Sequence, residues 1–289
     1  QPLMSVITNI DKDHLENHKN SFDVLKKNFL EFINNLPFYG LCLLNMNDIN
    51  SRSVINEISR PIKTFGMETN ADYEATSPNL NVMPATFNYK EDGKEYPIKL
   101  NMAGLHNIMN SLAALAAARE LGVPIKTIQK ALINFPGINR RFEIIGNFKV
   151  NNKKFIWIDD YGHHPTEMKE VLETISKVWS KRRLIMVFQP HRYSRTAEHF
   201  NQFVDILKKV DNLILMDIYA ANETPINNIN SEAIATEIKK YNKNVFLANN
   251  NKDLSEYINN NVKENDILLT MGAGNISQFV NHYKKLITK

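Results

Sequence analysis

The sequence predicts an α/β protein of two domains, and three features support this prediction. Short apolar runs of strand length alternate with longer amphipathic runs of helix length, a pattern typical of βαβ units around a largely parallel sheet. The chain has 289 residues, which suggests about two domains at ~150 residues each. Residues 136–139, Pro-Gly-Ile-Asn, look like a linker between two alternating regions. We therefore expect domains at residues 1–136 and 137–289.

In the first region, local patterns predict each element in turn. Ser21 suits a helix N-cap, and the apolar periodicity after it predicts a helix at 21–36. The run Glu-Asp-Gly-Lys at 91–94 predicts a hairpin turn within a strand-prone stretch at 71–100. The other expected elements are strands at 3–9, 41–45 and 62–66, and helices near 48–58, at 107–121 and at 125–135, the last two divided by Gly122-Val123-Pro124. Because a strand opens this region with no partner before it, we expect an incomplete domain.

In the second region the alternation restarts and is nearly regular. The expected strands lie at 155–159, 184–188, 213–217, 245–248 and 267–271, and the expected helices at 165–179, 197–210, 231–241, 252–262 and 275–287. This order predicts a nearly complete doubly wound domain, similar to a Rossmann fold.

Composition excludes several classes of protein. Lys and Arg number 35 against 31 Asp and Glu, and the basic residues are dispersed, so we expect no nucleic-acid partner. No apolar run approaches the ~18 residues of a membrane span, and the N-terminus has no secretory pattern, so we expect no membrane partner. The single cysteine, Cys42, lies in an apolar run and predicts a buried thiol in a reducing compartment. The cytoplasm is therefore the expected location.

Two polar clusters each follow an apolar run of strand character. Residues 159–167 read Asp-Asp-Tyr-Gly-His-His-Pro-Thr-Glu, and residues 189–196 read Gln-Pro-His-Arg-Tyr-Ser-Arg-Thr. Ligands of open α/β sheets bind beyond the carboxyl ends of the strands, so both clusters should border one site. The N-terminus of the helix after the first cluster favours an anion, and Arg192 and Arg195 suit a carboxylate. We expect group transfer on an anionic ligand.

Three smaller groups have both a functional and a structural interpretation. His14, in an Asp-His pair just after an expected strand, is interpreted either as a metal ligand or as an ordinary surface histidine. His106, Asn107 and Asn110 suit contact with a nucleobase, although an Asn is also a good helix cap. Arg141 suits phosphate, or forms a solvated ion pair.

Two patterns imitate other sites. The histidines His163 and His164 suggest zinc, but adjacent histidines point in different directions, and no Cys or second His four residues away completes a zinc set. The run Gly-Ala-Gly-Asn at 272–275 imitates a dinucleotide-binding turn, but Ser277 stands where the third glycine belongs. We interpret this run as a tight turn.

Seven runs of residues occur in a fixed order along the chain. They are Thr-Asn-Ile-x-x-Asp-His at 8–14, Leu-Pro-Phe-Tyr-Gly at 36–40, Gly-x-His-Asn-x-x-Asn at 104–110, Arg-Arg-Phe at 140–142, the two clusters at 159–167 and 189–196, and Gly-Ala-Gly-Asn-Ile at 272–276. Together they resemble the Mur ligases over essentially the whole chain. Within that family, the two long clusters resemble the member that adds an amino acid directly to UDP-N-acetylmuramate.

The resemblance implies an activity and a role for each candidate residue. It implies ATP and Mg²⁺ as cofactors and UDP-N-acetylmuramate and L-alanine as substrates: ATP phosphorylates the lactyl carboxylate, and the alanine amine attacks the acyl phosphate, in peptidoglycan synthesis. It places His14 at the magnesium, His106, Asn107 and Asn110 around the adenine, Arg141 on the phosphates, Asp160 on the ribose, and His164, His191, Arg192 and Arg195 around the amino acid and the acyl phosphate. Positive groups there stabilise transferring phosphoryl oxygens.

One departure from the family pattern concerns phosphate binding. The family has a phosphate loop ending in Gly-Lys-Thr after a domain that binds the nucleotide sugar, whereas the only Gly-Lys pair here, Gly93-Lys94, precedes Glu95. We therefore expect a partial central ATP-binding domain and a complete amino-acid-binding domain, inactive without the missing N-terminal segment. The alternatives are a murein tripeptide recycling ligase, a non-catalytic nucleotide or amino-acid binding module, and a metallohydrolase using His163, His164 and His191.

Overall fold

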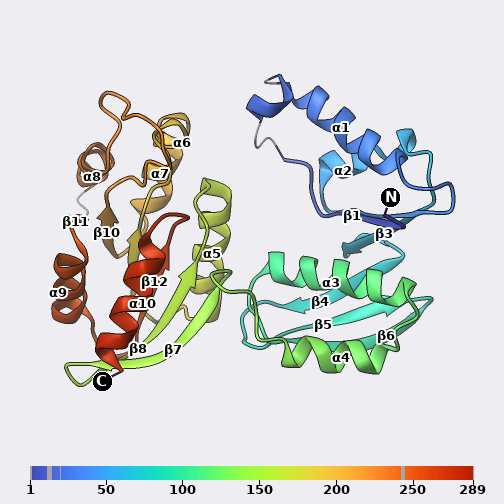
Figure 1. Ribbon diagram of the computed structural model, residues 1–289. Coiled ribbons are helices and arrows are strands. Elements are labelled where there is room, and N and C mark those ends of the chain that lie inside the picture. Colours follow the sequence, from blue (N-terminus) through green and yellow to red (C-terminus); the bar gives the residue numbers. More distant parts are fainter. Residues whose placement is uncertain (1, 12–14, 20, 242–244, 289) are drawn as a thin grey trace. The chain divides into compact units, whose positions relative to one another are not determined.

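The computed structural model describes residues 2–11, 15–19, 21–241 and 245–288 (Figure 1). The chain forms two compact units, Gln1–Pro136 and Gly137–Lys289. Each unit contains one six-stranded sheet with helices packed on it, so the predicted α/β fold is confirmed. Within the described ranges, no helix combines the length and the apolar character needed to cross a bilayer.

The sheet of the first unit follows the order of the sequence. Its strands run β1-β2-β3-β4-β5-β6, with parallel pairing from β1 to β4 and antiparallel pairing from β4 to β6. The strands are β1 (Met4–Ile7), β2 (Leu41–Asn45), β3 (Ile62–Met67), β4 (Tyr73–Asn79), β5 (Ala85–Glu91) and β6 (Lys94–Leu100). The helices are α1 (Phe22–Asn34), α2 (Ile49–Ser53), α3 (Leu105–Glu120) and α4 (Ile125–Asn134), with 3₁₀ turns η1 (Leu15–His18) and η2 (Ile55–Glu57).

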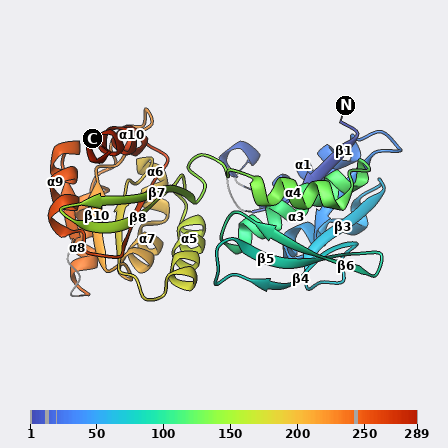
Figure 2. The same cartoon turned by 90° about the horizontal axis from the view of Figure 1, so that it is seen from below.

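Alternating side chains of β2 enter two separate cores of this unit. Leu43 packs with residues of α3 and α4, whereas Cys42 and Leu44 pack with α1 on the opposite face of the sheet. Figure 2 shows α3 and α4 side by side. Cys42 is fully buried, as predicted, and burial raises the pKa of its thiol.

Two local predictions for the first unit are confirmed and one is wrong. The Ser21 side chain accepts a hydrogen bond from the N–H of Val24 and caps α1. Asp92 and Gly93 both have positive φ, as the two-residue turn between β5 and β6 requires. The expected helix at 48–58 is instead the short α2, capped by Asp48, followed by η2.

The second unit is a doubly wound domain whose strand order differs from its sequence order. Its sheet runs β11-β10-β9-β12-β8-β7, and every pair is parallel except β7 with β8. The strands are β7 (Glu143–Val150), β8 (Lys153–Asp160), β9 (Leu184–Phe188), β10 (Asn212–Met216), β11 (Val245–Ala248) and β12 (Asp266–Met271). The helices are α5 (Pro165–Val178), α6 (Tyr193–Glu198), α7 (Phe200–Leu207), α8 (Ser231–Lys239), α9 (Asn251–Asn261) and α10 (Ile276–Ile287).

Helices cover both faces of this sheet. Residues of α9 and α10 share one core with alternate residues of β8, β9, β10 and β12. On the other face, Phe203 of α7 packs against Phe188 of β9, with ring centroids 5.6 Å apart.

Two elements of the second unit were not predicted. The antiparallel edge strand β7 was missed because Gly146 and Asn147 interrupt its apolar pattern, and a register shift lies between Ile144 and Gly146. The expected helix at 197–210 begins earlier, at Tyr193, and is divided into α6 and α7 at His199.

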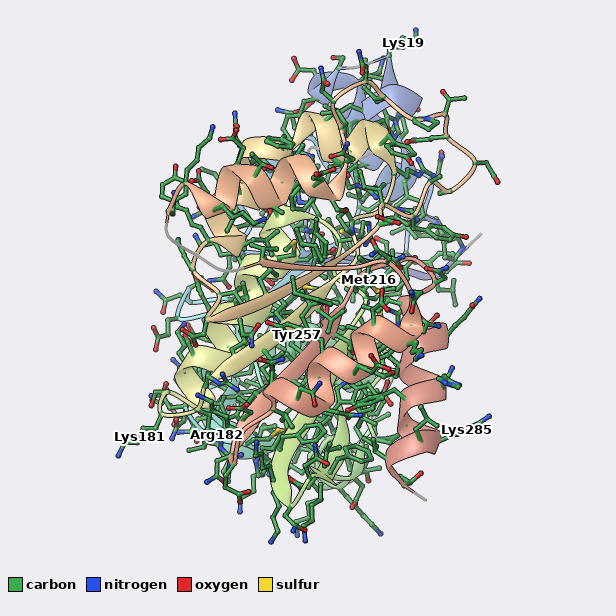
Figure 3. The ribbon with its side chains drawn as sticks, turned by 90° about the vertical axis from the view of Figure 1, so that its left-hand side faces the viewer. Lys19, Lys181, Arg182, Met216, Tyr257 and Lys285 are labelled. Carbon is green, nitrogen blue, oxygen red and sulfur yellow. The ribbon has the colours of Figure 1, made fainter. Side chains whose placement is uncertain are left out.

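The strand order places several strand ends at one edge of the sheet. Met271, the last residue of β12, is the register partner of both Asp160, at the end of β8, and Phe188, at the end of β9. Figure 3 labels Met216, the last residue of β10, and Arg182, just before β9, at opposite ends of the sheet. The loops after β8, β9, β10 and β12 therefore leave from the same end as Met216.

Candidate functional site

The loop after β8 is fixed by the carboxylate of Asp160. This carboxylate is 4% exposed and accepts hydrogen bonds from the backbone N–H of Phe142 (2.7 Å) and of Gly162 (2.6 Å). The N–H of Tyr161 donates to the carbonyl of Arg140 (2.6 Å). Burial raises the pKa of Asp160 to about 6, although both N–H groups oppose that shift. Asp160 thus holds residues 161–164 against the segment that enters β7.

The first turn of α5 is closed by its own side chains. The Glu167 carboxylate accepts hydrogen bonds from the N–H of His163 (3.0 Å) and of His164 (3.2 Å). The Nδ1 of His164 accepts from the N–H of Thr166 (3.4 Å), and Pro165 begins the helix, as predicted. Burial would raise the pKa of Glu167, but the N–H of His163 and its other donors outweigh burial and lower it. The N–H groups of His163, His164 and Thr166 therefore already donate to side chains of the protein.

The adjacent histidines have different neighbours. The ring of His163 lies 5.4 Å from that of Tyr161 and 5.6 Å from that of His191, measured between centroids. The ring of His164 lies 4.5 Å from that of His199. The residue beside His191 is therefore His163, and the role predicted for His164 at the amino acid stays a prediction.

His191 follows β9 and is held by two neighbours. The guanidinium Nη1 of Arg195 lies 3.1 Å from its Nδ1, and its ring stacks on that of Tyr219 at 5.6 Å between centroids. Because a guanidinium can only donate, Nδ1 accepts, and the proton of the neutral imidazole is on Nε2. Burial lowers the pKa of His191 to about 4, and the charges of His163 and Arg195 act in the same direction. The ring is thus a neutral hydrogen-bond donor at neutral pH.

The two arginines of this loop differ in exposure. Arg192 is exposed, has a φ of 69°, and donates its N–H to the carbonyl of Tyr219 (2.8 Å). Arg195 is half-buried on α6. Ser194, two residues after Arg192, donates its hydroxyl to the carboxylate of Glu223 in the loop after β10 (2.6 Å). The loops after β9 and β10 are therefore joined by both backbone and side-chain hydrogen bonds.

The remaining cations lie over Tyr161. The guanidinium of Arg141 is 5.5 Å from the centre of this ring and 3.5 Å from the carboxylate of Glu167. Arg140 lies 5.3 Å from the same ring centre and donates to the buried carboxylate of Asp159 (2.9 Å). Arg141 is the more exposed of the two, so its guanidinium is the one accessible to a ligand.

Contacts therefore connect several predicted residues of this unit. They run from Arg141 through Tyr161 and His163 to His191 and Arg195. Sequence reasoning missed Tyr219 and Glu223. The only available signal was that residues 219–225, Tyr-Ala-Ala-Asn-Glu-Thr-Pro, follow the third expected strand of this region. The set can present donors to a small anion, and a carboxylate suits the guanidinium of Arg195 beside the imidazole of His191.

The predicted residues of the first unit lie near the start of α3. His106 is half-buried, Asn110 is exposed, and Asn107 is 6% exposed and donates its amide to the carbonyl of Ala103 (2.7 Å). This bond braces the first turn of α3, so Asn110 is the amide better placed for a ligand. His14, the predicted metal ligand, lies outside the described residues. Among the residues that are described, no three His, Cys, Asp or Glu side chains are grouped to hold a metal ion.

Comparison with known families gives two matches that together span most of the chain. The Mur ligase middle domain matches residues 1–118, and the Mur ligase, glutamate ligase domain, matches residues 140–274.

Individual relatives agree with these matches. A UDP-N-acetylmuramate–L-alanine ligase of Vesicomyosocius okutanii is 43% identical over 96% of this chain and 60% of its own length. One from Hydrogenovibrio crunogenus is 39% identical over 98% of this chain and 62% of its own. The crystal structure of the UDP-N-acetylmuramate-alanine ligase of Thermotoga maritima has a TM-score of 0.77 at 26% identity, covering 99% of this chain and 60% of that one. The chain thus spans about 60% of the length of the relatives it matches.

Proposed function

The chain belongs to the Mur ligase family, and we propose that it forms the nucleotide-binding and amino-acid-binding part of a UDP-N-acetylmuramate:L-alanine ligase. Two relatives with that name, at 43% and 39% identity, support this choice within the family. The proposed reaction belongs to peptidoglycan synthesis: ATP phosphorylates the lactyl carboxylate, the amine of L-alanine attacks the acyl phosphate, and phosphate leaves as the amide forms. The cytoplasm stays the predicted location.

One observation carries this proposal: the guanidinium of Arg195 contacts His191 at 3.1 Å, and His163 lies beside the same ring. An amino acid needs a cationic partner for its carboxylate, while its amine must remain able to attack. A neutral imidazole next to a guanidinium meets both needs, because it adds a donor without adding a second fixed charge.

We assign roles to the residues of the second unit from this geometry. Arg195 or Arg192 binds the alanine carboxylate, and His191 donates from Nε2 to the carboxylate or to the acyl phosphate. His163 is added to this group because its ring neighbours that of His191. His164 was predicted for the same task; because its ring packs on His199, we propose that it acts by capping α5.

The nucleotide assignments remain proposals based on the family resemblance. They are Arg141 for the phosphates, Asp160 for the ribose, and His106, Asn107 and Asn110 for the adenine of ATP. Asp160 already accepts two backbone hydrogen bonds, so a ribose contact would use a remaining lone pair. The described residues contain no group of three His, Cys, Asp or Glu side chains that could hold Mg²⁺, and His14 is not among them.

Titration of the purified chain with L-alanine, followed by NMR, tests the amino-acid site. NMR detects binding in the millimolar range, which a small zwitterion with few contacts is expected to show. We expect saturable shifts at His191, weaker binding of D-alanine, and at least about tenfold weaker L-alanine binding in Arg195→Ala, because one charged hydrogen bond is lost. Arg182→Ala, in the same unit but at the other end of the sheet, is the matched control and should bind normally.

Two outcomes would contradict the proposal. One is the absence of L-alanine shifts in a folded chain, and the other is an Arg195→Ala variant that binds as tightly as the unchanged protein. Preferential binding of a murein tripeptide would favour the recycling ligase. In a phosphate-release assay with ATP, UDP-N-acetylmuramate, L-alanine and Mg²⁺, we expect no turnover from this chain alone, since its sequence contains no Gly-Lys-Ser or Gly-Lys-Thr run.

A further inference from the structure

Gln189 is a buried polar residue immediately after β9, and it has no role in the proposed reaction. It is 4% exposed, in the interior of the second unit. A buried side-chain amide must have its hydrogen bonds satisfied, because an unpaired polar group in the interior is costly. The hydrogen-bond partners of Gln189 therefore show which segments of the unit its side chain joins.

These partners belong to the ends of two neighbouring strands, β10 and β12. The Oε1 of Gln189 accepts from the N–H of Ile276 in the first turn of α10 (2.9 Å). Its Nε2 donates to the side chain of Asn275 (2.7 Å) and to the carbonyl of Asp217 after β10 (3.4 Å). Its own backbone N–H donates to the carbonyl of Met271 (3.0 Å). One residue thus connects the end of β9 to the loops after β10 and β12.

The glycines of the Gly-Ala-Gly turn are explained by the same residue. A Cβ on Gly272 would lie 2.6 Å from the carbonyl oxygen of Gln189, and one on Gly274 would lie 2.5 Å from its Oε1 and 2.6 Å from the Cβ of Tyr219. Real Cβ atoms essentially never make contacts as short as these, so only glycine allows this turn to fit around Gln189 and Tyr219. Close packing against Gln189 and Tyr219 therefore explains the two glycines that make this run resemble a dinucleotide-binding turn.

The segment between Gln189 and His191 is short and held at both ends. Pro190 separates the two residues, and its carbonyl accepts from the N–H of Tyr219 (2.9 Å). The N–H of Arg192 donates to the carbonyl of Tyr219 (2.8 Å). Gln189 holds the near end of this segment, and Tyr219 holds the far end and stacks on the imidazole between them.

We propose that Gln189 is a positioning residue: through its bond to Ile276 it fixes the loop after β9 against the first turn of α10, and thereby sets where His191 stands in the amino-acid site. The part concerning the amino acid rests on the proposed function. The part concerning the position of His191 does not, because it follows from hydrogen bonds within the unit.

Two substitutions separate positioning from simple stability. Gln189→Met keeps the length of the side chain but removes its hydrogen bonds. Gln189→Glu keeps the Oε1 acceptor for Ile276, and Asn275 can turn its amide to donate to the second oxygen. Both variants should melt at lower temperature than the unchanged chain, because one loses buried hydrogen bonds and the other buries a charge. Gln278→Met, an exposed glutamine on α10, is the control.

The deciding readout is the NMR titration of the His191 ring, with L-alanine binding as a second. The pKa of His191 is about 4 in the folded chain because the ring is buried beside His163 and Arg195. In Gln189→Met we expect it to rise by at least about one unit as the ring moves outward, and L-alanine binding to weaken at least about tenfold. In the control, both should stay near the values of the unchanged chain. In Gln189→Glu the buried carboxylate itself raises the pKa of His191, but the ring should keep its place, so that its NMR contacts with the ring of Tyr219 are unchanged.

Each result supports or overturns the proposal. A Gln189→Met variant with an unchanged His191 titration overturns it, even if the variant is less stable, because Gln189 would then be only structural. Loss of the NMR contacts between His191 and Tyr219 in Gln189→Glu also overturns it, because the bond to Ile276 is retained there. If the unchanged chain does not bind L-alanine, the proposed function fails, while the His191 titration still decides the role of Gln189.

Discussion

The buried carboxylate of Asp160 makes a specific prediction about pH and stability. It is 4% exposed and holds the loop that carries Tyr161 and His163 through the N–H groups of Phe142 and Gly162. The substitution Asp160→Asn removes the titrating group, keeps one oxygen acceptor and leaves the size of the side chain unchanged. The pH dependence of the difference in unfolding free energy between the two proteins therefore isolates the ionisation of Asp160.

The sign and size of the effect follow from the pKa. Burial raises it from 3.8 to about 6. Because the folded-state pKa is the higher one, the contribution to stability is complete below pH 3.8 and is lost as the pH rises through about 6. The full shift corresponds to about 3 kcal/mol, and nearly half of it falls between pH 5.0 and pH 7.5. The advantage of Asp160 over the Asn variant should shrink by between about 1 and 2 kcal/mol across that range.

Urea unfolding followed by tryptophan fluorescence measures this difference. Both tryptophans, Trp157 and Trp179, belong to the second unit, so the signal reports the unit that contains Asp160. Asp205→Asn is the control: a hydrogen bond from Lys208 lowers the pKa of that exposed carboxyl, so its difference should be flat between pH 5.0 and pH 7.5. A difference for Asp160→Asn that stays constant, or that grows with pH, would refute the reasoning.

Two further substitutions test other parts of the structure. Thr270→Val should destabilise the second unit by about 2 kcal/mol, because the buried Thr270 hydroxyl accepts from the indole of Trp157 (3.1 Å) and donates to Asp159 (2.6 Å). Urea unfolding followed by fluorescence measures this loss of stability, and an unchanged midpoint would contradict the prediction. Gly93→Ala should destabilise the first unit by about 1 kcal/mol, because φ is +74° and the added methyl group would have no atom within 4 Å to pack against. Circular dichroism during thermal unfolding measures this change, and a more stable variant would show that an alanine is not strained in this turn.

Much of the fold could be predicted from the sequence because its elements have strong local patterns. The apolar strands from β8 to β12 and the amphipathic helices between them were found within a few residues. The edge strand β7 was missed because a strand with one exposed face, interrupted at Gly146, has neither the apolar run nor the alternation that marks a strand. The early start of α6 was missed because Arg192 has left-handed backbone just before it, a conformation that an arginine in the sequence does not reveal.

The candidate site was predictable only where its residues formed long motifs. His191 and Arg195 are four residues apart and come together within one loop and helix. Tyr219 and Glu223 join them only because β10 lies beside β9, and Gln189 meets Asn275 only because β12 lies on the other side of β9. Strand order is a property of the whole fold, so no local pattern indicates these neighbours. The choice between His163 and His164 depends on how the loop turns, which Asp160 and Glu167 decide.

The place of β12 in its sheet affects how the two units can fold during synthesis. In the first unit each new strand is added beside the previous one, so the sheet can grow as the chain leaves the ribosome. In the second unit β12 stands between β8 and β9, and these two strands share no neighbour until residues 266–271 have emerged. Pairing across such sequence separations is slow and leaves strand edges exposed meanwhile. The edges of β8 and β9 that β12 covers therefore stay open until the last strand of the second unit has been made.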